Sequence, residues 1–118
     1  MRSKFMIFFL LLVFMLIFSP LAQAKDVEVT ITNNTGSTMT YLYISESGKN
    51  SWEEDILGPD FLNIRILEPG YYCEFVIDDS VSWDLRAQFR NGTVQEYYNF
   101  NFAQYQNITL NRNDASMR

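Results

Sequence analysis

The chain has no histidine and a single cysteine, Cys73. Histidine is the commonest general base near neutral pH and the commonest metal ligand, so its absence argues against most catalytic triads and most zinc sites. With one cysteine the chain forms no internal disulfide, and an exported domain must then rely on its hydrophobic core. Cys73 shares a predicted strand face with Phe75 and Ile77 and has no basic neighbour in sequence, which predicts an inert core thiol.

Positive charge is also scarce. The chain carries 9 Lys and Arg against 14 Asp and Glu, for a net charge of −5. Residues 1–24 contain two of the cations and no acid, so the remaining chain has a net charge of 7 − 14 = −7. Its cations are scattered rather than clustered. Nucleic acids and anionic membrane surfaces both require a positive footprint, so neither is an expected partner.

Residues 1–24 read as a signal peptide. Arg2 and Lys4 form a basic start, residues 5–18 are an unbroken apolar run, and Ala22-Gln23-Ala24 fits a signal peptidase site. The run is short for a membrane span, which needs roughly 17–25 residues. We therefore expect export, cleavage after Ala24, and a protein that is periplasmic or extracellular and has no membrane contact after cleavage.

Residues 25–118 read as one all-β domain. Apolar residues alternate with polar ones, or β-formers accumulate, at 27–31, 39–44, 61–67, 71–77, 83–90, 94–98 and 108–110. Short strands at regular spacing, separated by turn residues, are typical of a β-sandwich or small barrel. The expected fold is a small single-domain antiparallel β-sandwich of about seven short strands, and the tail at 111–118 is expected to fray.

Turn chemistry suggests how neighbouring strands connect. Residues 33–37 predict a turn that returns 39–44 beside 27–31, and Glu68-Pro69-Gly70 predicts a type II turn between 61–67 and 71–77. Asn91-Gly92 predicts a type I′ hairpin, which would place Phe89 opposite Val94 and Glu96 opposite Ala87 on the inner face. A buried carboxylate is costly, so either Glu96 lies near an open end of the core or a bulge shifts it. The alternation also predicts that Asp84, Arg86, Gln88 and Arg90 point outward.

The longest predicted connection, residues 45–60, carries the candidate site. Its first half is too polar to pack and is expected to be mobile, and 52–57 has the pattern of one helical turn capped by Ser51. Connections of this length in compact domains are usually functional or disordered. Tryptophan is favoured at binding hot spots, so we expect Trp52 to anchor a partner. Glu53, Glu54 and Asp55 would then favour a cation or a basic partner.

These observations predict a non-catalytic binding or interaction module, with an unknown protein or glycan partner in the cell envelope or outside the cell. Two alternatives stay open: a secreted hydrolase that uses carboxylates such as Asp78, Asp79 and Asp84, or a purely structural envelope protein. Paired carboxylates are the groups that glycosidases use, but the chain has no nucleophile motif. The tyrosines at 71, 72, 97, 98 and 105, with the two tryptophans, could line a groove, although aromatic residues are common in any sheet.

No cofactor is expected. The acids Glu46, Glu53, Glu54, Asp55 and Asp60 lie within or beside one loop, and clustered carboxylates suit calcium. Their spacing does not match the EF-hand loop, so weak calcium binding by this acidic loop is the most that the pattern indicates.

Several short motifs also fall in one order along the chain: NNTG at 33–36, LYIS at 42–45, Trp52, LG at 57–58, PG at 69–70, DLR at 84–86 and NG at 91–92. This order resembles a family of small exported bacterial proteins of unknown function. The resemblance implies a signal peptide followed by one β-rich domain, and it supplies no catalytic residue. Members often carry a cysteine a few residues before the DLR motif and another after the last hairpin. This chain has neither, so the resemblance implies no disulfide here.

Overall fold

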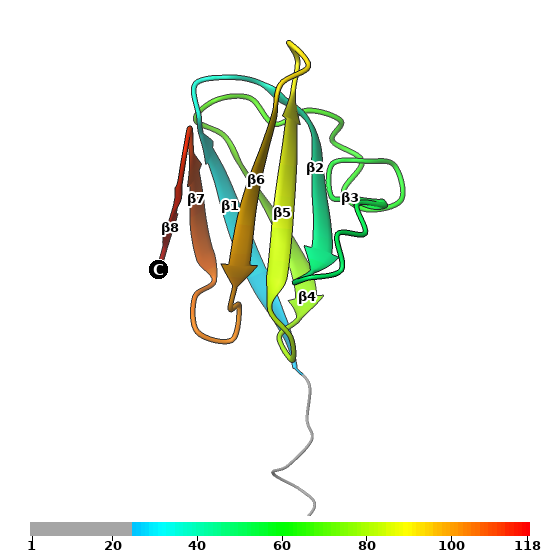
Figure 1. The fold of residues 1–118 in the computed structure, drawn as a ribbon, viewed down its shortest axis with the longest axis vertical. Coiled ribbons are helices and arrows are strands. Elements are labelled where there is room, and N and C mark those ends of the chain that lie inside the picture. The colour runs from blue at the N-terminus through cyan, green and yellow to red at the C-terminus, as the bar shows by residue number, and fades with distance from the viewer. Residues whose placement is uncertain (1–24) are drawn as a thin grey trace, which may run out of the picture.

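A computed structural model describes residues 25–118, so the predicted signal peptide at 1–24 lies outside the described residues. The described chain forms strands and turns without a helix (Figure 1). Its strands are β1 (Asp26–Asn34), β2 (Met39–Glu46), β3 (Glu54–Asp55), β4 (Tyr72–Asp78), β5 (Trp83–Phe89), β6 (Val94–Phe100), β7 (Asn107–Asn111) and β8 (Ala115–Met117). The predicted all-β class is confirmed.

The strands form two four-stranded sheets that face each other across the core (Figure 1). One sheet has the order β4-β1-β7-β8 and the other the order β3-β2-β5-β6. Neighbouring strands are antiparallel except β1 and β7, which are parallel. This sandwich leaves each sheet with one face on the core and one outer face.

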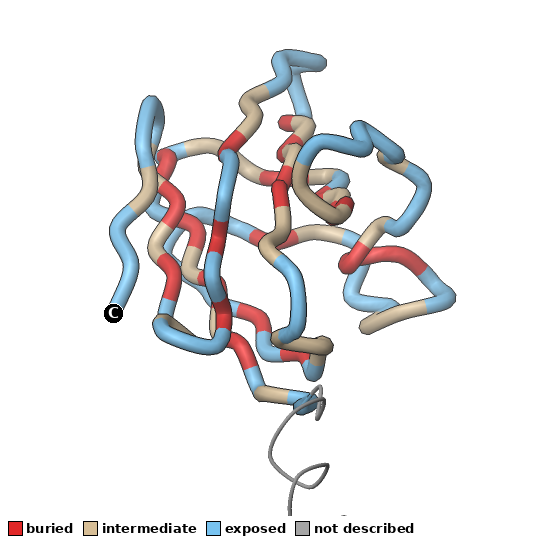
Figure 2. Tube along the Cα trace, turned by 60° about the horizontal axis from the view of Figure 1, so that its bottom comes forward, coloured by how far each residue is buried: buried red, intermediate tan, exposed pale blue. Residues whose placement is uncertain are grey.

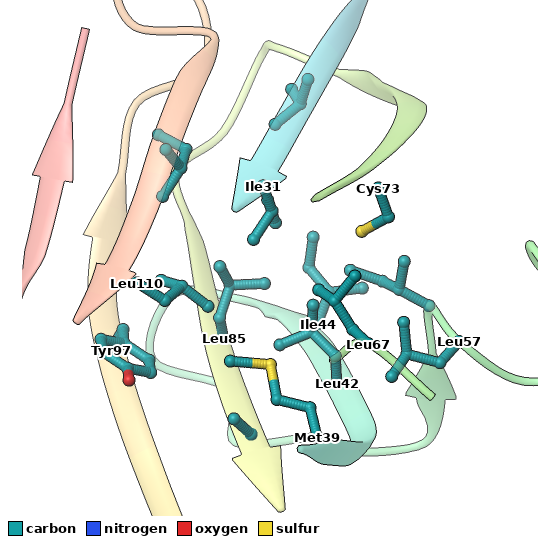
Figure 3. Close-up of a cluster of buried hydrophobic side chains, with 14 of the residues drawn as sticks. Ile31, Met39, Leu42, Ile44, Leu57, Leu67, Cys73, Leu85, Tyr97 and Leu110 are labelled. Carbon is teal, nitrogen blue, oxygen red and sulfur yellow. The ribbon is translucent and has the colours of Figure 1, made fainter. Parts of the chain in front are cut away.

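The core forms where the inward residues of both sheets meet (Figure 3). Ile31 on β1, Leu42 on β2 and Leu85 on β5 are completely buried. Side chains of this kind each contribute about 1.5–3 kcal/mol when fully buried. Buried residues alternate with half-buried or exposed ones along β1, β4 and β7, and this is the period of two that the sequence predicts. Figure 2 shows how burial varies along the whole chain.

The predicted pairing of residues 39–44 with 27–31 is wrong, because the chain changes sheets between β1 and β2. The buried amide side chain of Asn33 holds this crossing. Its Nδ2 donates to the carbonyls of Ser37 and Leu67, both at 2.8 Å, and its Oδ1 accepts from the Thr35 hydroxyl at 2.6 Å. A crossing that satisfies its polar groups inside the core lets consecutive strands lie in different layers.

The predicted strand at 61–67 does not form. Asn63 and Arg65 have φ angles of 55° and 70°, in the left-handed region outside the φ range of regular strands. The Ile66 amide donates to the Ile64 carbonyl at 2.8 Å, a γ-turn that leaves Ile64 exposed. Only Leu67 pairs with another segment, through an isolated bridge to Met39. The predicted type II turn at 68–70 is supported by the Tyr71 amide, which donates to the Glu68 carbonyl at 3.0 Å.

Other strands find partners that the sequence pattern does not specify. β4 pairs with β1 instead of with residues 61–67, although Cys73 and Phe75 face the core as expected. The tail does not fray in this structure, because Ala115–Met117 forms β8 against β7. Met39 is buried beside Leu42 because a bulge between Met39 and Tyr41 turns both residues inward.

The hairpin of β5 and β6 forms with a different turn from the one predicted. Gly92 has a φ of 90°, but Asn91 is not in the left-handed region that a type I′ turn needs at both positions. The Gly92 amide donates to the Phe89 carbonyl at 2.8 Å and the Phe89 amide to the Thr93 carbonyl at 2.9 Å, which makes a three-residue loop with a glycine bulge. The extra residue shifts the register by one.

This shift settles the position of Glu96, which lies opposite Arg86 instead of Ala87. Its Oε2 is 3.6 Å from the Arg86 Nε on the outer face of the sheet. Of the two alternatives that the sequence left open for Glu96, the structure adopts the bulge. The hairpin therefore buries no carboxylate.

Candidate functional site

The connection from β2 to β4 is fixed to the body of the protein at several points. The Ile56 amide donates to the Leu42 carbonyl at 2.8 Å, and Ile56 and Leu57 are completely buried. The start of the connection is also held, since the Ser47 amide donates to the Ser82 carbonyl at 2.9 Å. Hydrogen bonds thus hold parts of the loop expected to be mobile at 45–51, although residues 48–51 are exposed.

Asp55 explains why Glu54–Asp55 forms the short strand β3 instead of the helical turn expected at 52–57. Its Oδ1 accepts from the amides of Leu42 at 3.0 Å and Leu57 at 3.1 Å. The bond to Leu42 ties the connection to β2, where Asp55 pairs with Tyr43. Gly58 packs so closely that a Cβ there would lie 3.1 Å from the Asp55 carboxylate. Asp55 is therefore a structural residue of this connection.

Trp52 is half-buried and lies beside β5 instead of in the core. The guanidinium carbon of Arg86 is 5.9 Å from the centre of the Trp52 ring, within the range of a cation–π interaction. Arg86 also approaches Glu96, and Glu96 accepts a hydrogen bond from the Tyr98 hydroxyl. Trp52 is thus positioned on the outer face of the β3-β2-β5-β6 sheet by a row of polar side chains.

Two tyrosines of β2 extend this surface. The rings of Tyr41 and Tyr43 stack with centroids 5.5 Å apart and planes within 3° of parallel. Tyr43 pairs across the sheet with Arg86, the residue under Trp52. Burial, followed by the nearby charge of Asp55, raises the pKa of Tyr43. We call the surface formed by Tyr41, Tyr43, Trp52 and Arg86 the Trp52 face.

The three predicted binding acids have different roles in the structure. Glu53 and Glu54 are exposed and follow Trp52 directly in the chain, whereas Asp55 is half-buried and engaged in backbone bonds. The Ser51 hydroxyl donates to Glu53 Oε2 at 3.3 Å. All three acids line a small hollow of about 120 Å³, together with Gly58, Pro59, Asp60 and Phe61. Glu53 and Glu54 are the acids available to a partner.

Sequence reasoning found Trp52 but not its companions on the face. The sequence pattern assigned no role to Tyr41 and Tyr43, and Arg86 was expected only to point outward. The alternation of Tyr41 and Tyr43 was the available signal, since residues two apart share one face of a strand. The closeness of Trp52 to Arg86 had no sequence signal because it depends on how the connection folds back.

The hydrolase alternative would use the carboxylates of Asp78, Asp79 and Asp84. In the structure each of them stabilises a turn or a bulge. Asp78 Oδ1 accepts from the Ser80 amide at 2.7 Å, and hydrogen bonds from Ser80 lower the pKa of Asp78. A general acid needs a raised pKa, whereas the pKa of Asp78 is lowered. Asp79 Oδ1 accepts from the Lys25 backbone nitrogen at 3.1 Å.

Asp84 was expected to point outward and is buried, with 2% of its surface exposed. It accepts from the Ser47 hydroxyl at 2.8 Å, the Gly48 amide at 3.2 Å and the Asn99 amide at 2.9 Å. A bulge in the β5–β6 pairing, between Trp83 and Leu85 on β5, accompanies this arrangement.

The remaining aromatic residues do not form one groove. Tyr97 is buried and its hydroxyl donates to the Asn111 carbonyl at 2.6 Å, while Trp83 Nε1 donates to the Asp78 carbonyl at 2.9 Å. Tyr71 and Tyr72 are exposed at the start of β4. Cys73 is buried as expected, and burial raises the pKa of its thiol to about 12, so it is a poor nucleophile.

Within residues 25–118, no three His, Cys, Asp or Glu side chains gather in an arrangement that would hold a metal ion. Glu46, one acid of the predicted calcium loop, is paired with Lys49 at 3.2 Å. The same part of the chain contains no helix long and apolar enough to cross a membrane.

Comparison with known proteins yields no family model, no curated protein and no solved structure that matches this chain.

Proposed function

We propose that this protein is an exported, non-catalytic binding module that contacts a basic segment of a partner protein through the Trp52 face. The observation that carries the proposal is the position of Trp52. It is a large aromatic residue from a connection, half-buried on the outer face of a sheet, where the core does not need it. Tryptophan, tyrosine and arginine are the residues enriched at binding hot spots, and this face contains all three types.

The charge around Trp52 supports a basic partner. Glu53 and Glu54 are exposed beside the tryptophan, and Asp60 is exposed in the adjoining hollow. The nearby cations are already engaged, since Arg86 contacts Trp52 and Glu96 and Lys49 is paired with Glu46. A basic segment would find unpaired carboxylates here, which would speed its association and orient it.

Export is part of the proposal, and one contact is consistent with cleavage after Ala24. The Lys25 nitrogen lies 3.1 Å from Asp79 Oδ1. Cleavage would turn this amide into an α-ammonium group, and the existing hydrogen bond would become an ion pair. The mass of the protein isolated from the cell envelope or medium checks this step, because it should correspond to a chain that begins at Lys25.

The binding proposal is tested by recovering the partner from the native envelope with wild type and with two doubly substituted variants. Glu53→Lys with Glu54→Lys should abolish recovery and leave the melting temperature nearly unchanged, because both side chains are exposed. Glu28→Lys with Glu74→Lys is the matched control, since it makes the same charge change on exposed residues of the other sheet. Asp55 is left intact because its substitution would disturb the connection.

Three results would contradict the proposal. Equal recovery by both double variants would show that the acids beside Trp52 do not select the partner. Unfolding of Trp52→Ala, with recovery by the acid variants unchanged, would show that Trp52 only closes the fold. A purified envelope glycan that binds wild type but not Trp52→Ala, independently of Glu53 and Glu54, would assign the face to a carbohydrate instead of a protein.

A further inference from the structure

β6 is a free edge of the β3-β2-β5-β6 sheet, and it differs from most of the other edges of the sandwich. β3 and β8 are edges of two and three residues, and such short edges give little backbone for another strand to pair with. β4 and β6 are edges of seven residues each. Long edges of this kind present rows of unpaired backbone groups and are templates for strand addition.

The register shows which backbone groups of β6 face away from β5. Phe89 is hydrogen-bonded to Thr93, and in an antiparallel pair the residues that bond to the partner alternate with those that do not. The outward set is therefore Val94, Glu96 and Tyr98. The Glu96 carbonyl accepts a 3.3 Å contact from the Gln95 side chain, which fits this direction. A second strand would displace one weak side-chain contact and gain a backbone ladder.

A groove of about 300 Å³ lies between β6 and β8, where the two sheets open at one side of the sandwich. Its lining includes Tyr97 and Phe100 from β6 and Ala115 and Met117 from β8. Met117 is 40% exposed and Tyr98, at the rim, is 53% exposed. β6 thus combines a free backbone edge with adjoining apolar surface.

The charge of the groove favours a basic strand over a second copy of this chain as its occupant. Its charged lining residues are Glu96 and Asp114, and no Lys or Arg lines it. A second copy of this acidic chain, paired antiparallel about Glu96, would place Glu96 opposite its own symmetry mate, and like charges directly opposite are destabilising. A strand with basic residues avoids this repulsion.

We propose that β6 accepts an extended segment of a partner protein, in which apolar and basic residues alternate, as an added strand of the β3-β2-β5-β6 sheet. Residues of a strand point alternately to its two faces. The apolar residues of the added strand enter the groove against Phe100, Ala115 and Met117, and the basic residues lie on the outer face near Glu96. Backbone bonds to Val94, Glu96 and Tyr98 supply affinity, and the groove supplies side-chain selectivity.

The test uses fluorescence anisotropy of labelled synthetic nonapeptides with purified protein. The probes are alternating Val and Lys, alternating Val and Glu, and the Val/Lys peptide with a central proline. We expect the Val/Lys peptide to bind with a Kd about tenfold lower than either control, which corresponds to about 1.4 kcal/mol. Equal binding of the proline-interrupted peptide, or no binding of the Val/Lys peptide, would overturn the proposal.

Two substitutions locate the binding site. Val94→Pro removes an amide that faces away from β5 at the first residue of the strand, where proline is tolerated, and Val94→Ala is its control. Met117→Lys places a cation in the groove, and Met117→Leu is its control. Each test variant should weaken Val/Lys binding about tenfold, or about 1.4 kcal/mol, and neither control should. Unchanged binding by both test variants would move the site elsewhere.

If Val94→Pro fails to fold, hydrogen exchange of the wild-type protein tests the proposal instead. The amides of residues 94, 96 and 98 should become protected when the Val/Lys peptide is added, and unchanged exchange there would refute strand addition. Concentration-dependent dimerisation that Val94→Pro abolishes would assign the edge to a second copy instead. Trp52→Ala should leave the peptide-induced protection of these three amides unchanged, so this site and the Trp52 face succeed or fail separately.

Discussion

Replacing Asp84 by alanine should destabilise the protein strongly, although no sequence pattern marks this residue as structural. Its buried carboxylate joins three segments by accepting from the Ser47 hydroxyl, the Gly48 amide and the Asn99 amide. These donors belong to the connection after β2 and to the bulge of β6, so the carboxylate holds both against β5. Alanine would leave the two amides without this acceptor.

The magnitude follows from the number and kind of these bonds. A hydrogen bond to a charged group contributes about 1.5–3 kcal/mol, and a buried donor left without a partner costs about 1–3 kcal/mol. Because the three bonds share one carboxylate, their contributions are not additive. We expect Asp84→Ala to lower the unfolding free energy by about 3–5 kcal/mol, a large fraction of the stability of a typical domain.

Two milder variants separate the contributions of the individual hydrogen bonds to the unfolding free energy. Asp84→Asn keeps Oδ1 for Ser47 and Asn99 but places an NH₂ group toward the Gly48 amide, so it should cost about 1–3 kcal/mol. Ser47→Ala removes one bond from a half-buried hydroxyl that water can replace, so it should cost the least, about 1 kcal/mol. The expected order is therefore Asp84→Ala, Asp84→Asn and Ser47→Ala, from the largest loss to the smallest.

Urea denaturation followed by tryptophan fluorescence measures these losses. Asp60→Ala is the control, because it removes an exposed carboxylate and should change stability by less than about 0.5 kcal/mol. A loss below about 1 kcal/mol for Asp84→Ala, close to the control, would refute the reasoning that this carboxylate joins the three segments.

Two further predictions follow from the structure. Asp55→Ala should cost about 2–4 kcal/mol in urea denaturation because two backbone amides lose their acceptor, whereas exposed Glu54→Ala should cost less than about 0.5 kcal/mol. Similar costs for both would contradict the structural role of Asp55. The second prediction concerns alkaline pH. Burial raises the pKa of Cys73 from 9.0 to about 12 and that of Tyr97 from 10.0 to about 12. The unfolded chain therefore loses these protons first, and stability that is intact below pH 9 should fall toward pH 12, by up to about 1.4 kcal/mol per pH unit for each group. Cys73→Ala should remove the part of this fall between pH 9 and 10, and parallel stability curves for variant and wild type would contradict the assignment.

Local patterns were sufficient to predict the fold class. Alternation along 27–31, 71–77 and 83–90 predicted strands that the structure contains, because a strand buries every second residue whatever its partner is. Glycine at Gly70 and Gly92 marked turns, since each has a positive φ. The same local signals identified the position of Trp52 in a long connection.

Partner choice and register were decided by tertiary structure. Asn33 sends β2 into the other sheet because its amide finds acceptors in Ser37 and in the distant Leu67. One extra residue in the turn before Thr93 moves Glu96 from the core face to a position opposite Arg86. A single-residue shift reverses the face of every side chain, and alternation alone does not contain that information.

The candidate site divides in the same way. The sequence by itself determined that Trp52 and its acids lie in a long connection, because composition and spacing are local properties. Only the tertiary structure separated exposed Glu53 and Glu54 from structural Asp55, and only it brought Trp52 to Arg86 and left β6 as a free edge. These outcomes depend on contacts between residues far apart in the chain, which form only when the two sheets pack together.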